Sequence, residues 1–263
     1  FQCAHIPTYP FPERAASALG ALVRRTETLD RRSQTIERAA QGRNPTLASP
    51  NTTSAVELIS SYGISTALIK FARDKDEAAD IANKIGFPLV MKIASPDIVH
   101  KSDAGGVLLN INDIPTLHSS YAQMMKRVKA LIPPPRIEGV YLQRQIADGQ
   151  EVIIGMVRDP LFGVLMMFGA GGIEVEGLKD VTFALAPLNQ AGAREMIRKT
   201  WAGKKLRGFR SIPPVDEKSV IDALIKLSRL AMDHENIEEI EINPLRVLSK
   251  GAVAVDVRVK LRA

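Results

Sequence analysis

The sequence has almost none of the thiols from which disulfides and cysteine metal clusters are built. Cys3 is the only cysteine among 263 residues. An internal disulfide and a cysteine-based metal cluster are therefore excluded. A chain without disulfides agrees with the reducing cytoplasm, which is the location we expect.

Aromatic residues and net charge are too scarce to indicate a nucleic-acid surface. Phe, Trp and Tyr make up 5% of the chain, and the formal net charge is +6. Residues 1–45 carry seven arginines and four acidic residues, so half of the excess lies there. A modest excess is typical of a solvated helix face, whereas nucleic-acid binding requires a larger basic patch with aromatics between the charges. We expect no nucleic-acid partner.

Long apolar runs are also missing from the sequence, and its first residues do not have the pattern of a secretion signal. No apolar run reaches the roughly 18 residues of a membrane-spanning helix. The start, F-Q-C-A-H-I-P-T-Y-P, is polar and interrupted by proline, so we expect no signal peptide. We therefore expect no membrane partner. Because the first residue is Phe1 rather than Met, we expect a processed chain or a fragment of a longer one.

The apolar residues that are present recur at helical or alternating spacing and predict an α+β fold of two lobes. The expected parts are an extended segment, helix and linker over 1–49, a first lobe over 50–137 and a second lobe over 138–263. Helices are expected over residues 12–40, 54–62, 75–85, 114–132, 191–200 and 216–234. Strands are expected over residues 67–72, 88–93, 106–111, 139–146, 151–157, 164–168, 181–185, 237–242 and 252–257.

One polar loop between two apolar strands combines groups that suit a polyphosphate. Lys92 ends the first strand, and the loop V-H-K-S-D-A-G-G-V contains His100, Ser102, Gly105 and Gly106. A cation beside glycine-rich backbone with free N–H groups is suited to phosphate oxygens. The imidazole could accept a phosphoryl group. The alternatives are a surface lysine at a strand end and a structural histidine.

Two further segments are weaker indications of a nucleotide. Gln143 to Ile146 is extended, and Glu151 begins the next strand after an Asp-Gly turn, an arrangement that can hold an adenine edge and a ribose. Glu151 could equally be a solvated strand end. The run Gly169–Gly172 follows an apolar strand and fits a phosphate turn, although glycine runs alone are unspecific.

Oxygen ligands gather near the C-terminus. In E-I-N-P, Glu241 and Asn243 lie two residues apart, and side chains at this spacing share one face of a strand. Asp256 lies in the apolar run A-V-A-V-D-V-R-V, where a carboxylate requires a buried partner or a metal. Together they predict a site for Mg²⁺ bound to substrate phosphates. The alternative is a salt bridge from Asp256 to Arg258 or another cation.

At these residues the chain resembles the ATP-grasp subunit of the ADP-forming acyl-CoA synthetases, in the succinyl-CoA synthetase superfamily. The likeness covers about residues 50–259. It rests on the separated motifs K-I-A-S-P-D-I-V-H-K-S-D-A-G-G-V, G-Q-E-V-I-I-G, R-D-P-L-F-G, F-G-A-G-G-I-E-V-E, K-D-V-T-F-A-L-A-P-L and E-I-N-P-L followed by V-D. One departure is Val164, where the family usually has proline.

The resemblance implies an ATP-grasp fold, in which two α+β lobes clamp a nucleotide, and the reaction acyl-CoA + ADP + phosphate ⇌ acid + CoA + ATP. It implies that His100 relays a phosphoryl group and that Glu241, Asn243 and Asp256 surround Mg²⁺. It further implies that residues 1–49 are the tail of an upstream CoA-ligase domain. The nucleotide contacts it implies are Lys92, Ser102, Gly105, Gly106, Gln143, Arg144, Ile146, Glu151, Gly171 and Gly172.

The expected partner is a CoA-ligase domain or α subunit, which carries the main phosphohistidine and binds CoA and a carboxylic acid. One rival hypothesis is the regulatory synthetase-like body of a protein lysine acetyltransferase. Such a body need not keep His100, so the retained site residues argue for an enzyme part. A carboxylate–amine ligase with a similar fold is a third possibility, against which the H-K-S-D loop argues.

Overall fold

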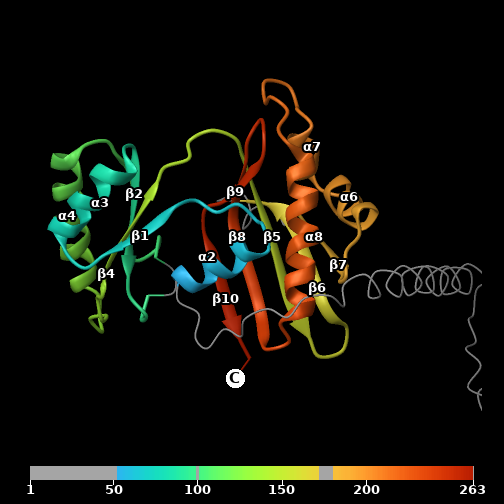
Figure 1. The fold of residues 1–263 in the computed structure, drawn as a ribbon, viewed down its shortest axis with the longest axis horizontal. Coiled ribbons are helices and arrows are strands. Elements are labelled where there is room, and N and C mark those ends of the chain that lie inside the picture. The colour runs from blue at the N-terminus through green and yellow to red at the C-terminus, as the bar shows by residue number, and fades with distance from the viewer. Residues whose placement is uncertain (1–51, 99–100, 172–179, 263) are drawn as a thin grey trace, which may run out of the picture.

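The computed structural model describes residues 52–98, 101–171 and 180–262. Two α/β bodies lie side by side, each built on its own antiparallel sheet (Figure 1). The helix expected over residues 12–40 and the linker after it lie outside the described residues. Within the described ranges, no helix has the length and apolar character needed to cross a membrane.

The smaller body is a four-stranded sheet with the strand order β1-β4-β2-β3 and two helices packed against it. Local signals set its helices: the carboxylate of Asp74 accepts hydrogen bonds from the N–H groups of Asp76 and Glu77, and Gly86 ends the same helix with a φ of 81°. The elements are β1 (Ile69–Ala72), α3 (Lys75–Ile85), β2 (Leu89–Ala94), β3 (Val107–Ile111), α4 (Ile114–Lys129) and β4 (Gly139–Arg144).

The larger body is a six-stranded sheet with the order β10-β8-β5-β6-β7, in which β9 also pairs with β8. Its core is the larger of the two, and Leu224 and Leu227 of the long helix α8 are fully buried in it. The strands are β5 (Gln150–Asp159), β6 (Gly163–Ala170), β7 (Val181–Leu185), β8 (Ile237–Val247), β9 (Ala252–Ala254) and β10 (Val257–Leu261). The helices are α2 (Thr52–Ser61), α6 (Gln190–Arg198), α7 (Trp201–Leu206) and α8 (Glu217–Asp233).

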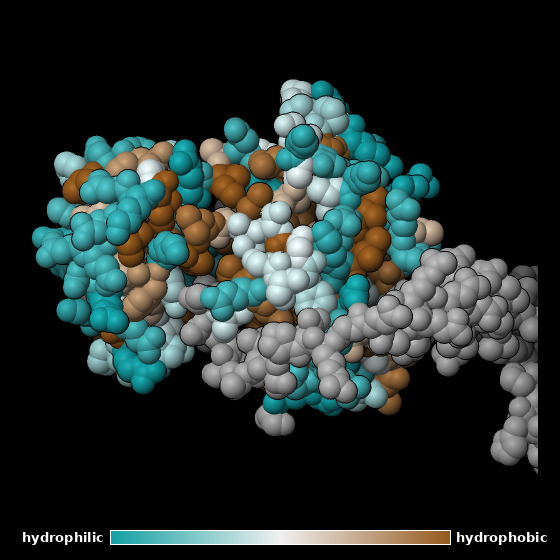
Figure 2. Space-filling view, viewed as in Figure 1, coloured by the Kyte–Doolittle hydropathy of each residue, from teal (hydrophilic) through white to brown (hydrophobic). Residues whose placement is uncertain are grey.

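Helix α2 falls within residues 50–137, the range proposed for the first lobe, but it packs with the larger body. Its residues Ala55, Leu58 and Ile59 belong to the core beneath the six-stranded sheet. The chain then crosses to the smaller body beside β9, where the N–H of Ala67 donates to the carbonyl of Ala254 at 2.9 Å. Figure 2 shows apolar and intermediate side chains along the line where the bodies meet, and mostly hydrophilic ones on the outer surface of the smaller body.

The C-terminal strands differ from the prediction in a way that shapes the site. The strand expected over 237–242 continues through Pro244 to Val247, and the strand expected over 252–257 is two strands separated by Val255 and Asp256. The register between β5 and β8 shifts so that Asn243 and Pro244 lie opposite the single residue Ile153. This β-bulge accommodates the proline, and the break between β9 and β10 lies beside it. Asp256 is therefore not inside a regular strand.

Sequence reasoning also missed one short helix. Two residues, Lys199 and Thr200, separate helix α7 from α6, and the hydroxyl of Thr200 accepts a hydrogen bond from the N–H of Gly203. The carboxylate of Asp180 accepts two more, from the N–H groups of Trp201 and Ala202, at 2.8 and 2.7 Å. The capping threonine is a signal in the sequence, but a six-residue helix is too short to show periodicity.

Candidate functional site

A cleft of about 1370 Å³ lies between the two bodies and is lined by residues of both. This volume is ample for a nucleotide, because ligand pockets usually measure about 300–1,000 Å³. Nine predicted site residues line it: Lys92, Ser102, Gln143, Arg144, Ile146, Glu151, Glu241, Asn243 and Asp256. His100 and Gly172 lie outside the described residues.

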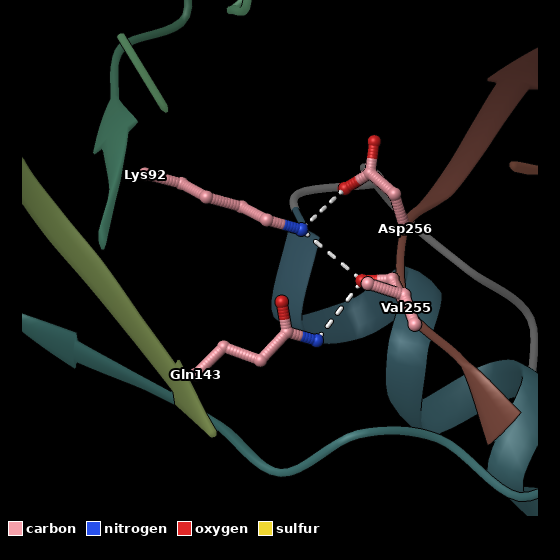
Figure 3. Close-up of polar contacts among 4 residues, drawn as sticks. All are labelled: Lys92, Gln143, Val255 and Asp256. Carbon is pink, nitrogen blue, oxygen red and sulfur yellow. Dashed lines mark hydrogen bonds and ion pairs between the residues drawn. The ribbon is translucent and has the colours of Figure 1, made fainter. Parts of the chain in front are cut away.

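Lys92 and Asp256, predicted from opposite ends of the sequence, meet across this cleft (Figure 3). Lys92 is on the fully buried strand β2 and is 6% exposed. Its Nζ lies 3.0 Å from Oδ1 of Asp256 and 3.1 Å from the carbonyl oxygen of Val255. The salt bridge from Asp256 to Arg258 or another cation, the alternative considered from the sequence, is therefore present, and its cation is Lys92.

The residues proposed for magnesium share the larger body. The Nδ2 of Asn243 donates to Oε1 of Glu241 at 3.1 Å, and both residues line the cleft with Asp256. The side chain of Asp256 is 30% exposed, and the ammonium of Lys92 already contacts it. The described residues contain no group of three or more His, Cys, Asp or Glu side chains arranged to hold a metal. Such a sparse set fits Mg²⁺, which binds through one or two carboxylates plus substrate phosphates.

At the other end of the cleft, the connection between β4 and β5 is held by an ion pair. Glu151 accepts from Nη2 of Arg246 at 2.5 Å, and Nη1 of the same arginine donates to the carbonyl of Ala147 at 3.3 Å. Glu151 is therefore not a free strand end. Glu151 and Ile146 both line the cleft.

The glycine turn after Lys92 is built differently from what the sequence suggested. The N–H of Gly105 donates to the carbonyl of Ser102 at 3.0 Å, and the N–H of Gly106 donates to that of Lys101 at 2.7 Å. These two donors are used within the loop and are not free for a phosphate. A Cβ at Gly106 would lie 2.4 Å from Cγ2 of Ile93, so the glycine permits close packing.

Gly171 has a similar structural role. Its N–H donates to the carbonyl of Glu151 at 3.2 Å, and a Cβ would lie 2.7 Å from the backbone of Val152. Gly105, Gly106 and Gly171 are not among the residues that line the cleft.

Lys101 is a site residue to which sequence reasoning gave no role. It lines the cleft, and its Nζ lies 5.5 Å from the ring centre of Tyr141. Burial lowers the pKa of Lys101; Asp256 opposes that shift, and the positive charges of Lys92 and Arg258 add to it. The sequence signal was its place in the H-K-S-D loop. The positive charges of Lys92, Lys101 and Arg258 lie on this part of the lining and suit it to an anion such as a phosphate.

Comparison with known proteins agrees with this geometry. Residues 41–261 match a family model described as an ATP-grasp domain. The ADP-forming acetate–CoA ligase I of Archaeoglobus fulgidus is 44% identical over 204 residues, which are 78% of this chain and 30% of the relative. The β subunit of the ADP-forming acetate–CoA ligase I of Pyrococcus furiosus is 41% identical over 222 residues, 84% of this chain and 94% of the subunit.

Solved structures give the same result. The dinucleotide-forming acetyl-coenzyme A synthetase 1 of Ca. Korarchaeum cryptofilum, in complex with coenzyme A and Ca-AMPCP, is 42% identical and matches with a TM-score of 0.77 over 80% of this chain and 92% of that chain. Another structure of that protein, with Mg-AMPPCP and a phosphohistidine segment that points towards the nucleotide site, is 39% identical, with a TM-score of 0.70 over 81% and 92% of the two chains.

These findings confirm the predicted fold class and favour the acid–CoA ligase over the acetyltransferase regulator. The chain spans about 30% of the single-chain Archaeoglobus relative but nearly all of the Pyrococcus β subunit. The chain belongs to the family of ATP-grasp domains found in the ADP-forming acyl-CoA synthetases.

Proposed function

We propose that this chain binds ADP or ATP with Mg²⁺ and transfers the phosphoryl group as part of an ADP-forming acyl-CoA synthetase. The observation that carries the proposal is the contact of Lys92 with Asp256 from opposite bodies inside a nucleotide-sized cleft. A basic strand end faces oxygen ligands there, which is the arrangement that a magnesium-bound polyphosphate requires.

The residues divide along the cleft by their chemistry. Lys92 would contact the phosphates, and Ser102 lies on the same side of the cleft. Asn243 and Asp256 would hold Mg²⁺ with Glu241 beside them, and the metal would neutralise phosphate charge. Arg144, Ile146 and Glu151 line the part of the cleft next to the β4–β5 connection and would hold the nucleoside.

His100 is proposed as the relay that takes the phosphoryl group from the nucleotide. An imidazole nitrogen can carry that group between closed sites and so limits its loss to water. The other reactants, CoA and a carboxylic acid, would bind to a CoA-ligase domain or α subunit with its own phosphohistidine. Support comes from the relatives: one is a separate β subunit, and a solved structure holds coenzyme A and a phosphohistidine segment.

Isothermal titration calorimetry tests the nucleotide site directly. The chain is expected to bind ADP in the presence of Mg²⁺, and Lys92→Met should weaken binding about tenfold or more, because a charge-assisted contact contributes about 1.5–3 kcal/mol. Lys70→Met is the matched control, since Lys70 is an exposed lysine on a strand of the same sheet. No heat of binding for the unaltered chain, or equal losses for both variants, would refute the site.

Phosphoryl transfer is tested separately. With the CoA-ligase partner supplied, His100→Asn should leave ADP affinity nearly unchanged and abolish transfer. Normal turnover by that variant would exclude the relay.

A further inference from the structure

The side chain of Gln143 bridges the two bodies next to the Lys92–Asp256 pair (Figure 3). Gln143 is on β4 of the smaller body and is only 2% exposed. Its Nε2 donates to the carbonyl oxygen of Val255 at 2.9 Å. Val255 lies in the break between β9 and β10, directly before Asp256. This hydrogen bond links the segment that carries the carboxylate to the smaller body. Within the larger body, the N–H of Val255 donates to the carbonyl of Pro244 at 3.0 Å and the N–H of Asn243 donates to that of Asp256 at 3.1 Å.

The orientation of this amide leaves a buried oxygen without a donor. A carbonyl oxygen can only accept, so the amide nitrogen of Gln143 must face Val255. Its Oε1 has no hydrogen-bond partner in the described part of the chain. Buried polar atoms are nearly always paired, and an exception calls for an explanation. Figure 3 shows this oxygen on the side of the amide that faces Lys92.

Lys92 and Gln143 share the same acceptor. The carbonyl of Val255 receives the ammonium of Lys92 at 3.1 Å as well as the amide of Gln143 at 2.9 Å. If the proposed function is right, Mg²⁺ takes Asp256 and the phosphates take Lys92. The contact between Lys92 and Asp256 is then given up. The hydrogen bond from Gln143 does not depend on that contact and can persist.

We propose that Gln143 is a positioning residue for magnesium binding rather than a contact for the nucleoside. Its Nε2 holds the Val255 carbonyl, and with it Asp256, while the ammonium of Lys92 turns from Asp256 to a phosphate. Its Oε1 offers the ammonium of Lys92 a hydrogen-bond acceptor while that ammonium moves from Asp256 to the phosphate. This inference rests on the proposed function and replaces the role that the sequence suggested for this residue.

The test separates magnesium-dependent from magnesium-independent affinity. Calorimetry with ADP alone and with ADP plus Mg²⁺ is carried out on the full 263-residue chain and on Gln143→Met, which keeps the length of the side chain but neither donates nor accepts through an amide. Binding of ADP with Mg²⁺ should weaken roughly 10–100-fold, as found for residues that orient a metal ligand. Binding of ADP alone should change less than about threefold, because Lys92 is retained.

Two further variants keep the result interpretable. Gln143→Asn keeps the amide but is one methylene too short to reach Val255, so it should behave like Gln143→Met and carries the test if that variant does not fold. Gln123→Met, at an exposed position of α4, should change neither affinity. Thermal unfolding followed by circular dichroism verifies that each variant is folded.

Each outcome bears on a different claim. If the unaltered chain binds no nucleotide, the proposed function fails first. If the chain binds but Gln143→Met and Gln143→Asn leave the affinity for ADP with Mg²⁺ unchanged, the positioning role is excluded. If the variants weaken ADP binding equally with and without Mg²⁺, Gln143 contacts the nucleoside directly and the inference is wrong.

Discussion

The contact between Lys92 and Asp256 should be measurable as a coupling energy between the two bodies of the apo protein. The two residues are 164 positions apart, and their charged atoms lie 3.0 Å apart. Their side chains are 8% and 30% exposed, so the pair is neither fully buried nor a surface pair. Its energy should therefore lie between two limits. Exposed pairs contribute about 0–1 kcal/mol. Loss of one partner from a buried pair costs about 3–5 kcal/mol.

The two single variants should differ in a defined direction. In Asp256→Asn the ammonium of Lys92 stays in a nearly dry position without its anion, and we expect a loss of about 2–4 kcal/mol in the free energy of unfolding. In Lys92→Met the partner left behind is Asp256, which water can reach, and we expect about 1–3 kcal/mol. The double variant should lose less than the sum, with a coupling energy of about 1–3 kcal/mol.

Urea unfolding without nucleotide or Mg²⁺, followed by circular dichroism, provides the four free energies. The control cycle uses Glu195 of α6 and Lys199, the residue that caps this helix, an exposed pair 2.8 Å apart, which should couple by no more than about 0.5 kcal/mol. If the Lys92–Asp256 coupling is no larger than that of this control, the contact does not hold the bodies together and the reasoning is refuted. A larger loss for Lys92→Met than for Asp256→Asn would show that the burial argument is wrong.

Two other predictions concern glycine and histidine. Gly192→Ala in α6 should stabilise the protein by about 0.5–1 kcal/mol, because an added Cβ would have no heavy atom nearer than 3.5 Å. Gly203→Ala in α7 should destabilise the protein, because the Cβ would lie 1.8 Å from the carbonyl oxygen of Ile197. Thermal unfolding compares the two variants, and equal midpoints would contradict this account of the packing. Burial lowers the pKa of His234, with Asp233 opposing the shift, so below a pH of about 6.5 the unfolded chain binds more protons and stability falls with falling pH. His234→Gln should lose that part of the pH dependence in urea unfolding measured from pH 7 to pH 5, and an unchanged profile would show that the residue does not titrate differently in the two states.

Local signals in the sequence were sufficient to locate most helices and strands. Asp74 and Gly86 bound α3 as predicted, and the strand over residues 181–185 has the predicted limits. Both cases depend on neighbours within one element: a capping carboxylate reaches the next turn, and β-branched and aromatic residues favour a strand. The chemistry of the site was readable for the same reason, because a lysine, a carboxylate and an amide keep their ligand preferences in any fold.

Only the tertiary structure decided how those groups meet. The run A-V-A-V-D-V-R-V reads as one strand, but the bulge at Asn243 and Pro244 breaks it at Val255 and Asp256. The contact of Gln143 with Val255, 112 residues away, likewise joins two bodies of the fold. Register, bulges and contacts between bodies depend on residues far apart in the chain, which local periodicity does not record. The sequence by itself therefore determined the elements and the chemistry of the site, whereas long-range pairing decided its geometry.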